Sequence, residues 1–208
     1  MKPSLHHMGL YGILTHPTVG YERLAAVMVD AGLRIIQLRM KDAPGDEVRR
    51  TADRLRAVIP SSVAFIINDD PVIAAESGAD GVHLGQGDMP YVQARALLGS
   101  EAIIGLSTHN PQQTRDACAL LPDYIGVGPV FATPTKKIPD PAIGLDGMAA
   151  MLAVSTVPAV CLGGIDHSNV CAVMEAGARN ICAVRCINAS ANPRQEIARL
   201  QEEMRRFS

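Results

Sequence analysis

The chain has 208 residues, a formal net charge of −2 and 48% hydrophobic residues. A chain of this length can bury roughly 70% of its unfolded surface, so we expect one domain over residues 1–208 that folds without disulfides. The small negative charge and the lack of a Lys/Arg run argue against nucleic acid as the main partner. The sequence has neither a signal-peptide pattern nor an apolar stretch near the ~20 residues of a spanning helix, so we expect a cytoplasmic protein with no membrane partner.

Short apolar runs alternate with amphipathic stretches along the whole chain. Eight runs rich in Val, Ile and Leu predict strands that are covered on both faces. They are Leu10–Thr15, Leu33–Arg39, Val63–Asn68, Gly81–Leu84, Ile103–Ser107, Tyr124–Gly128, Ala159–Gly163 and Asn180–Arg185. Eight strand–helix units predict an α/β protein with a (β/α)8 TIM-barrel fold. The alternative is a doubly wound open sheet, which would more usually have fewer units and a Gly-x-Gly-x-x-Gly fingerprint after the first strand.

The stretches between the runs have helical periodicity. After the second strand, Val48, Ala52, Leu55 and Ile59 fall on one face of a predicted helix. Capping side chains before prolines predict helix starts, and glycines predict helix ends with a left-handed residue. The starts are Asp70-Pro71, Asn110-Pro111 and Asn192-Pro193, and the ends are Gly32, Gly78, Gly99 and Gly177.

The cysteines give no sign of a disulfide framework. Their number is odd, no Cys-x-x-Cys occurs, and three of the five lie in apolar runs. We therefore expect buried free thiols in a reducing compartment, with a metal or redox role as the alternative. The five are Cys118, Cys161, Cys171, Cys182 and Cys186.

The second predicted strand ends in alternating polar and apolar residues. Gln37, Arg39 and Lys41 share one face, while Leu38 and Met40 share the other with Ile36. The polar face then points into the top of the barrel. Two cations and an amide are costly to bury there unless an anionic, hydrogen-bonding ligand meets them. The alternative is a solvated strand end.

Carboxylates follow the third and fourth strands. In Asn68-Asp69-Asp70, Asp70 is expected to cap the next helix, which leaves Asp69 for a ligand. Asp88, after the fourth strand, would reach the same rim. Mg²⁺ is typically held by one or two carboxylates together with substrate phosphates, so Asp69 and Asp88 predict a Mg²⁺ site. Alternatively, Asp88 caps the helix that opens near Pro90.

Later strand ends predict a second anion-binding area. Thr133 and Thr135 offer hydroxyls after the sixth strand, within an irregular stretch from Val130 to Ile143 that suits a functional or a disordered loop. Lys136, in the same stretch, is expected to join Arg39, Lys41, Asp69 and Asp88 in the first anion-binding area. Gly163-Gly164 and the Val184-Arg185 pair end the seventh and eighth strands, where barrels often bind phosphate. Ser107 and His109 end the fifth strand, and His109 is as well explained by packing as by catalysis.

These segments, in order and at matching strand ends, resemble the thiamine phosphate synthase family over nearly the whole chain. The segments that carry the resemblance are residues 37–41, 67–69, 78–86 with Asp88, 105–107, 126–131 with 133–136, and 163–165. The resemblance implies a Mg²⁺-dependent transferase of thiamine biosynthesis. It would join hydroxymethylpyrimidine diphosphate to hydroxyethylthiazole phosphate and release pyrophosphate through a dissociative, carbocation-like step.

The resemblance also implies roles for single residues. Arg39, Lys41, Ser107 and Lys136 would be catalytic, and Asp69 and Asp88 would bind Mg²⁺. The pyrimidine diphosphate would lie against Gln37, Arg39, Lys41, Asn68, Ser107 and Lys136. The thiazole phosphate would lie against Thr133, Thr135, Gly164, Val184 and Arg185. Leu38, Met40 and Pro134 would belong to the substrate-binding residues as well.

One departure from the family pattern concerns the second substrate. The family usually has Val-Ser where this chain has Val184-Arg185. Arginine either replaces the serine contact with a charged one or blocks the pocket. Alternatives to the synthase are a thiazole tautomerase-like isomerase that uses His109-type acid–base chemistry, a non-catalytic sensor of thiamine precursors, and another phosphosugar barrel enzyme. The sequence leaves open whether the chain forms a homo-oligomer.

Overall fold

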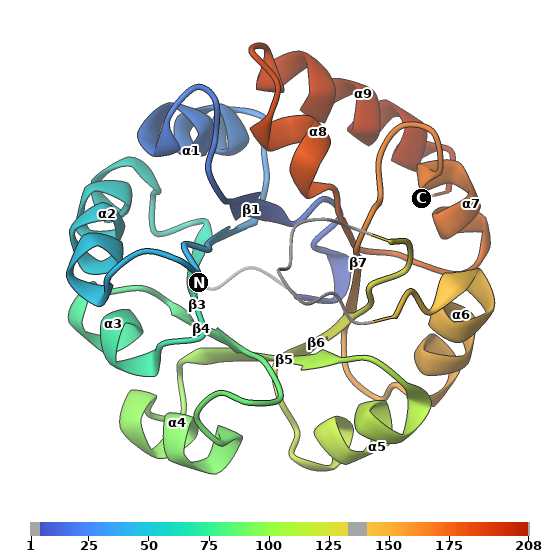
Figure 1. Cartoon of the computed structure of the whole chain (residues 1–208), viewed down its shortest axis with the longest axis horizontal. Helices are drawn as coiled ribbons and strands as arrows, with labels where there is room; N and C mark the ends of the chain where they lie inside the picture. Colours follow the sequence, from blue (N-terminus) through green and yellow to red (C-terminus); the bar gives the residue numbers. More distant parts are fainter. Residues whose placement is uncertain (1–4, 133–140, 208) are drawn as a thin grey trace.

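The computed structural model of the chain describes residues 5–132 and 141–207. Within these ranges, eight parallel strands form one sheet in sequence order, from β1 to β8. A parallel bridge between Leu10 and Ile181 joins the two edges of the sheet. The strands form the central ring in Figure 1 and the helices surround it. The predicted (β/α)8 barrel is therefore confirmed, and the open doubly wound sheet is excluded.

The elements alternate with few exceptions. The strands are β1 (Gly12–Leu14), β2 (Ile35–Leu38), β3 (Ala64–Asn68), β4 (Gly81–Leu84), β5 (Ile103–Thr108), β6 (Tyr124–Val127), β7 (Ala159–Leu162) and β8 (Ile181–Cys182). The helices are α1 (Tyr21–Asp30), α2 (Gly45–Val58), α3 (Pro71–Glu76), α4 (Tyr91–Leu98), α5 (Pro111–Ala119), α6 (Gly144–Val154), α7 (Val170–Glu175), α8 (Val184–Asn188) and α9 (Pro193–Arg205). A 3₁₀ turn, η1 (Leu5–His7), precedes β1.

Alternation along each strand divides the buried side chains between two cores. Ile35 and Ile66 pack inside the barrel with Tyr11, whereas Ile36 and Phe65 pack outward against the helices. Successive side chains of a strand point to opposite faces, so a strand buried on both sides needs apolar residues at every position. This explains why the strands read as continuous apolar runs in the sequence.

Most of the predicted helix boundaries are confirmed. The Asp70 carboxylate accepts hydrogen bonds from the backbone N–H groups of Val72 (2.8 Å) and Ile73 (3.0 Å), and Asn110 caps α5 in the same way. Asn192 precedes α9 without a side-chain cap bond. The four predicted C-terminal glycines all have positive φ, a conformation that costs a glycine little.

The prediction for the eighth strand is wrong at its end. β8 stops at Cys182, and Val184 and Arg185 belong to the first turn of α8. The backbone N–H of Ala189 donates to the Arg185 carbonyl (2.9 Å), which is a helical bond. Only Ile181 and Cys182 pair with β7. A short apolar run fits a strand and a buried helical turn equally well, and here the run continues through the bend between the two.

Two further predictions concern the whole chain. All five cysteines are free thiols, and Cys118, Cys161 and Cys182 are buried. In the part of the chain that the structure describes, no helix combines the length and the apolar character needed to cross a membrane.

Candidate active site

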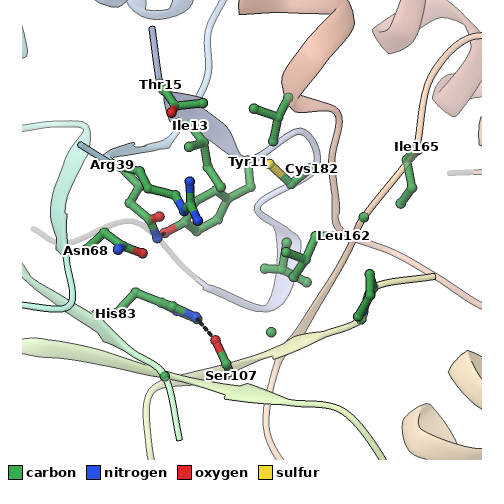
Figure 2. Close-up of a pocket in the computed structure, with 18 of the residues that line it drawn as sticks. Tyr11, Ile13, Thr15, Arg39, Asn68, His83, Ser107, Leu162, Ile165 and Cys182 are labelled. Carbon is green, nitrogen blue, oxygen red and sulfur yellow. Dashed lines mark hydrogen bonds between the residues drawn. The ribbon is translucent and has the colours of Figure 1, made fainter. Parts of the chain in front are cut away.

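A cavity of about 700 Å³ opens at the carboxyl ends of the strands. Every strand contributes to its lining, because the inward-facing residues of a closed barrel converge on one axis. One lining residue from each of the eight strands illustrates this: Ile13, Gln37, Asn68, His83, Ser107, Tyr124, Leu162 and Cys182. Figure 2 shows several of these side chains pointing toward one another across the cavity.

Cations and carboxylates gather on the β2–β4 side of the mouth. Arg39 and Lys41 follow β2, and Lys41 Nζ lies 3.1 Å from Asp69 Oδ2. Burial lowers the pKa of the Arg39 guanidinium, while the charges of Asp69 and Asp42 partly offset that effect. A cation with reduced hydration loses less on binding an anion than a fully solvated one. This corner is suited to an anionic ligand.

Asp69 and Asp88 form a carboxylate pair beside these cations. Burial and then the neighbouring Asp88 carboxyl raise the pKa of the Asp69 carboxyl, against the opposing effect of Lys41. Asp69 has a φ of 70°, and Asp88 is held by the backbone N–H of Gly85, 2.6 Å from its Oδ2. Two adjacent carboxylates repel each other when both are ionised, and a divalent cation removes the repulsion.

The donor set fits Mg²⁺ on one condition. Among residues 5–132 and 141–207, no group of three or more His, Cys, Asp or Glu side chains could hold a metal. A cation bound to the Asp69–Asp88 pair would therefore take its remaining oxygens from a ligand or from water, as Mg²⁺ commonly does. Asp88 is also free for this role because it does not cap α4, whose first turn has no side-chain cap bond.

The floor of the cavity is polar, and hydrogen bonds join its side chains to one another. Gln37 Nε2 donates to the Tyr11 hydroxyl (2.9 Å), which contacts the Tyr124 hydroxyl (2.8 Å). The Tyr124 hydroxyl contacts His83 Nδ1 (3.0 Å), and His83 Nε2 contacts Ser107 Oγ (2.9 Å). The last of these bonds is drawn in Figure 2. Five side chains from different parts of the barrel thus form one chain, with Gln37 and Ser107 at its ends.

The opposite wall consists of backbone and α8. Gly163 and Gly164 have positive φ, and a Cβ at Gly163 would lie 2.4 Å from Pro129 Cβ. Both positions therefore require glycine for conformation and for close packing. Arg185 lines the same wall from α8, and its charge contributes to lowering the pKa of the Asp166 carboxyl, after the hydrogen bonds from Ser168.

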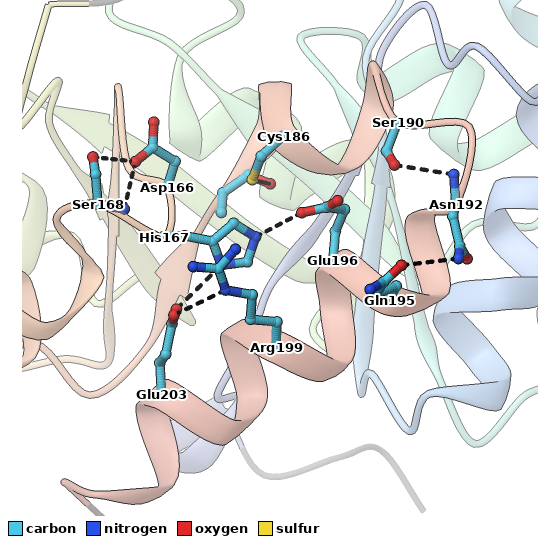
Figure 3. A network of polar contacts seen from close by, with 11 residues as sticks. Asp166, His167, Ser168, Cys186, Ser190, Asn192, Gln195, Glu196, Arg199 and Glu203 are labelled. Carbon is cyan, nitrogen blue, oxygen red and sulfur yellow. Dashed lines mark hydrogen bonds and ion pairs between the residues drawn. The ribbon is translucent and has the colours of Figure 1, made fainter.

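A polar network behind this wall fixes the loop between β7 and α7. His167 lies between two glutamates of α9, with Nε2 2.7 Å from Glu196 Oε2 and Nδ1 3.1 Å from Glu203 Oε2 (Figure 3). Arg199 pairs with Glu203 on its other side (3.4 Å). Through His167, α9 holds the segment that carries Gly163 and Gly164 at the cavity.

Comparison with known proteins identifies the family of this barrel. The model of the family described as thiamine monophosphate synthase matches residues 11–187. The chain belongs to this family. It is 45% identical over 176 residues to a thiamine-phosphate synthase of Gloeobacter violaceus, covering 84% of this chain and 51% of that protein. It is 40% identical to a thiamine-phosphate synthase of a Psychrobacter species, covering 80% of each chain.

Solved structures agree with this family. A thiamine phosphate pyrophosphorylase from Pyrococcus furiosus superposes with a TM-score of 0.87 at 26% identity, covering 98% of each chain. A 3-hexulose-6-phosphate synthase, with a TM-score of 0.70 and 18% identity, shares the fold. The chain spans little more than half the length of two of its curated relatives: 51% of the Gloeobacter protein and 59% of a thiamine-phosphate synthase of a Synechocystis species.

The structure brings together most of the site residues that the sequence predicts. Gln37, Arg39, Lys41, Asn68, Asp69, Asp88, Ser107, Gly164, Val184 and Arg185 all line the cavity. Leu38 and Met40 do not, because they point outward and are buried in the core between strands and helices. Thr133, Pro134, Thr135 and Lys136 lie outside the described residues. His109 lines the cavity with its Nδ1 2.6 Å from the Gly128 carbonyl oxygen.

Sequence reasoning missed three residues of the cavity floor, Tyr11, Tyr124 and His83. Each lies in an apolar run, where a tyrosine or histidine is normally interpreted as a residue of the hydrophobic core. A signal was present for His83, because its alternation with Val82 and Leu84 turns it toward the barrel interior. No local signal joins Tyr11 to Tyr124, which are 113 positions apart in the chain.

Proposed function

We propose that the chain is a thiamine phosphate synthase. It transfers the hydroxymethylpyrimidine group from its diphosphate to hydroxyethylthiazole phosphate, and it releases pyrophosphate. One observation carries the proposal beyond family membership. Arg39 and Lys41 stand beside the Asp69–Asp88 pair at the mouth of a cavity whose floor carries hydrogen-bonding groups. This is an arrangement for a ligand with an anionic end at the rim and a polar ring below it.

The chemistry that this corner supports is the departure of pyrophosphate. Negative charge grows on the leaving group as the bond to the pyrimidine methylene carbon breaks, and the arginine and lysine stabilise that charge without proton transfer. We assign the diphosphate to Arg39, Lys41 and, from the sequence, Lys136. Gln37, Asn68 and Ser107 line the same cavity, and we assign them to the pyrimidine ring.

Asp69 and Asp88 would hold Mg²⁺ in this proposal. The ion supplies further stabilisation of the pyrophosphate charge when it is bound. The residues present fit such an ion, since burial and the Asp88 carboxyl raise the pKa of the Asp69 carboxyl and a divalent cation would relieve the repulsion between the two carboxylates. Lys41 then contacts both the pair and the incoming diphosphate.

The second substrate is assigned to the opposite wall. Gly164 and Arg185 line the cavity across from Arg39, so the thiazole phosphate would enter with its anionic end away from the leaving pyrophosphate. The thiazole nitrogen then faces the pyrimidine carbon. The guanidinium of Arg185 would replace a neutral serine contact with a charge-assisted one.

An endpoint assay tests the proposal. Purified protein is incubated with both precursors and Mg²⁺, and thiamine phosphate and pyrophosphate are quantified. We expect both products in equal amounts, and neither in a sample treated with a chelator. A folded protein that binds the diphosphate but forms no product would refute the synthase and would favour a precursor-binding protein.

Removal of Arg39 tests the electrostatic role. Arg39→Gln should lower kcat by roughly 10²–10³-fold, as the loss of a transition-state donor does, with a smaller change in KM for the diphosphate. Arg34→Gln is the matched control. Arg34 is exposed at the opposite end of β2 and donates to the His7 carbonyl, so its loss should leave kcat unchanged. An unchanged kcat with raised KM in Arg39→Gln would contradict the assigned role.

A further inference from the structure

The hydrogen-bond chain under the cavity can be followed donor by donor. Gln37 donates its Nε2–H to the Tyr11 hydroxyl oxygen. Either hydroxyl can donate in the Tyr11–Tyr124 contact. The order that gives the Tyr11 hydrogen a partner runs from Tyr11 to Tyr124 and from Tyr124 to His83 Nδ1. With Nδ1 accepting, a neutral His83 carries its proton on Nε2 and donates to Ser107 Oγ. The Ser107 hydroxyl hydrogen is then left to be donated into the cavity.

The other end of the chain has the opposite character. Gln37 is 3% exposed and lines the cavity. Its Nε2 is directed at Tyr11, and its amide oxygen makes no hydrogen bond with any of the described residues. We take that oxygen as the group that Gln37 presents to the cavity. The two ends of the chain present an acceptor at Gln37 and a donor at Ser107.

The middle of the chain is buried. His83, Gly105 and Tyr124 lie in one row across β4, β5 and β6, and the missing side chain of Gly105 leaves the space in which the two rings meet. Their centroids are 5.4 Å apart. Burial raises the pKa of the Tyr11 and Tyr124 hydroxyls well above the ordinary value, so both stay protonated. Reversing the Tyr124–His83 bond would move the proton of a neutral His83 to Nδ1 and would reverse the His83–Ser107 bond as well.

We propose that Tyr11, Tyr124 and His83 are positioning residues that fix this polarity, and that the polarity selects the heteroaromatic ring of the substrate. The inference rests on the proposed function. The pyrimidine of thiamine carries an exocyclic amino group, which is a donor, and ring nitrogens, which are acceptors. The amino group donates to Gln37 Oε1, and a ring nitrogen accepts from the Ser107 hydroxyl. In a ring with an oxo group in place of the amino group, the donor and the acceptor are exchanged. Its oxo oxygen would then face the acceptor Gln37 Oε1, and its ring N–H would face the donor hydroxyl of Ser107.

The tautomer of His83 in the ligand-free protein is the first test. Nitrogen NMR of histidine-labelled protein distinguishes a proton on Nε2 from one on Nδ1. We expect the Nε2–H form alone in the wild-type protein, and a mixture of forms in Tyr124→Phe, which removes the hydroxyl and keeps the ring. A wild-type His83 that is protonated on Nδ1, on both nitrogens or on a mixture of the two would overturn the proposal.

Ring discrimination is the second test. Binding of the pyrimidine diphosphate and of its oxo-for-amino analogue is measured by calorimetry without the second substrate. Both ligands carry the same diphosphate, so the contribution of the cations cancels in the ratio of their dissociation constants. We expect the wild-type protein to prefer the amino ring by roughly 10²-fold or more, because a mismatched ring leaves buried polar groups unpaired.

Breaking the chain should remove this preference. In Tyr124→Phe, the Gln37–Tyr11 half and the His83–Ser107 half can reorient separately, so we expect the preference to fall at least about tenfold. Tyr91→Phe is the matched control. Tyr91 lies on α4, where its hydroxyl bonds the Leu121 carbonyl, and its loss should leave the preference unchanged. Tyr11→Phe breaks the chain at another point and gives the same test if Tyr124→Phe does not fold.

The outcomes separate this inference from the proposed function. If both ligands weaken equally in Tyr124→Phe and Tyr11→Phe, the tyrosines serve stability alone and the inference is wrong, while the synthase assay is unaffected. If wild-type protein binds neither diphosphate, the proposed function fails and the assignment of this ring fails with it. The polarity of the chain is still decided by the tautomer of His83.

Discussion

Replacing Gly105 with alanine should both destabilise the barrel and disturb its floor. A Cβ at this position would lie 2.2 Å from Tyr124 Cζ and 2.6 Å from His83 Nδ1. Non-bonded carbon atoms rest at about 3.5–4.0 Å, so the Tyr124 ring would have to move by roughly 1.3 Å or more. Tyr124 is 1% exposed and contacts Tyr11 on its other side, so it has little room to do so.

The cost follows from this overlap. Inserting a methyl group into a well-packed core destabilises by about 1–3 kcal/mol, and the rigid surroundings of Tyr124 place Gly105→Ala at about 3 kcal/mol. A domain of this length loses about 2–4 °C in melting temperature per kcal/mol, so Tm should fall by about 6–12 °C. The preference for the amino ring should fall as well, since His83 cannot hold its contacts with both Tyr124 and Ser107.

Thermal unfolding followed by circular dichroism, together with urea unfolding at 25 °C, measures the effect. Gly45→Ala is the matched control. Gly45 is the first residue of α2, and the nearest atom to an added Cβ is Ile73 Cδ1 at 3.8 Å. This control should be neutral or more stable by up to ~1 kcal/mol. A Gly105→Ala protein as stable as the control would refute the reasoning, because it would mean that the Tyr124 and His83 side chains can move aside at no cost.

Three further predictions concern other parts of the site. Asp69→Asn keeps a residue that tolerates a φ of 70°, so it should not lower Tm in the absence of metal. It should abolish the Mg²⁺-induced rise in Tm and lower turnover by roughly 10²-fold. A retained Mg²⁺ response would count against metal binding by the Asp69–Asp88 pair. His167→Leu leaves two partly buried glutamates of α9 without their shared partner, so Tm should fall by about 4–8 °C for a loss of about 2 kcal/mol. Arg194→Gln is the control, because it removes an exposed ion pair whose loss should cost about 0–1 kcal/mol. An equal fall in Tm in both variants would show that the contacts of His167 with the two glutamates stabilise the protein no more than an exposed ion pair does. Arg185→Ser should raise KM for the thiazole phosphate about tenfold and leave KM for the pyrimidine diphosphate unchanged, as expected for the loss of one charge-assisted hydrogen bond; improved turnover would instead identify Arg185 as an obstruction.

The rim of the cavity was more predictable than its wall. Polar residues that follow an apolar strand must lie at the carboxyl end of the sheet, so Arg39, Asp69 and Asp88 could be assigned to one place from the sequence. Val184 and Arg185 could not be assigned correctly, because an apolar run carries the same local signal in a short strand and in a buried helical turn. The pairing of β8 with β7 ends the strand at Cys182, and pairing is a property of the folded chain.

Local sequence patterns were enough to predict the alternation of strands and helices, the barrel that follows from it, and the rim at which the charged residues meet. These features depend on local patterns, because burial on both faces imposes continuous apolar runs and a parallel sheet gathers its strand ends at one edge. The floor was decided only by tertiary structure. Closing the barrel brings Tyr11 to Tyr124, and the missing side chain of Gly105 lets His83 reach the Tyr124 ring. Such contacts depend on which strands become neighbours and on the space between them, and no segment of the sequence records either.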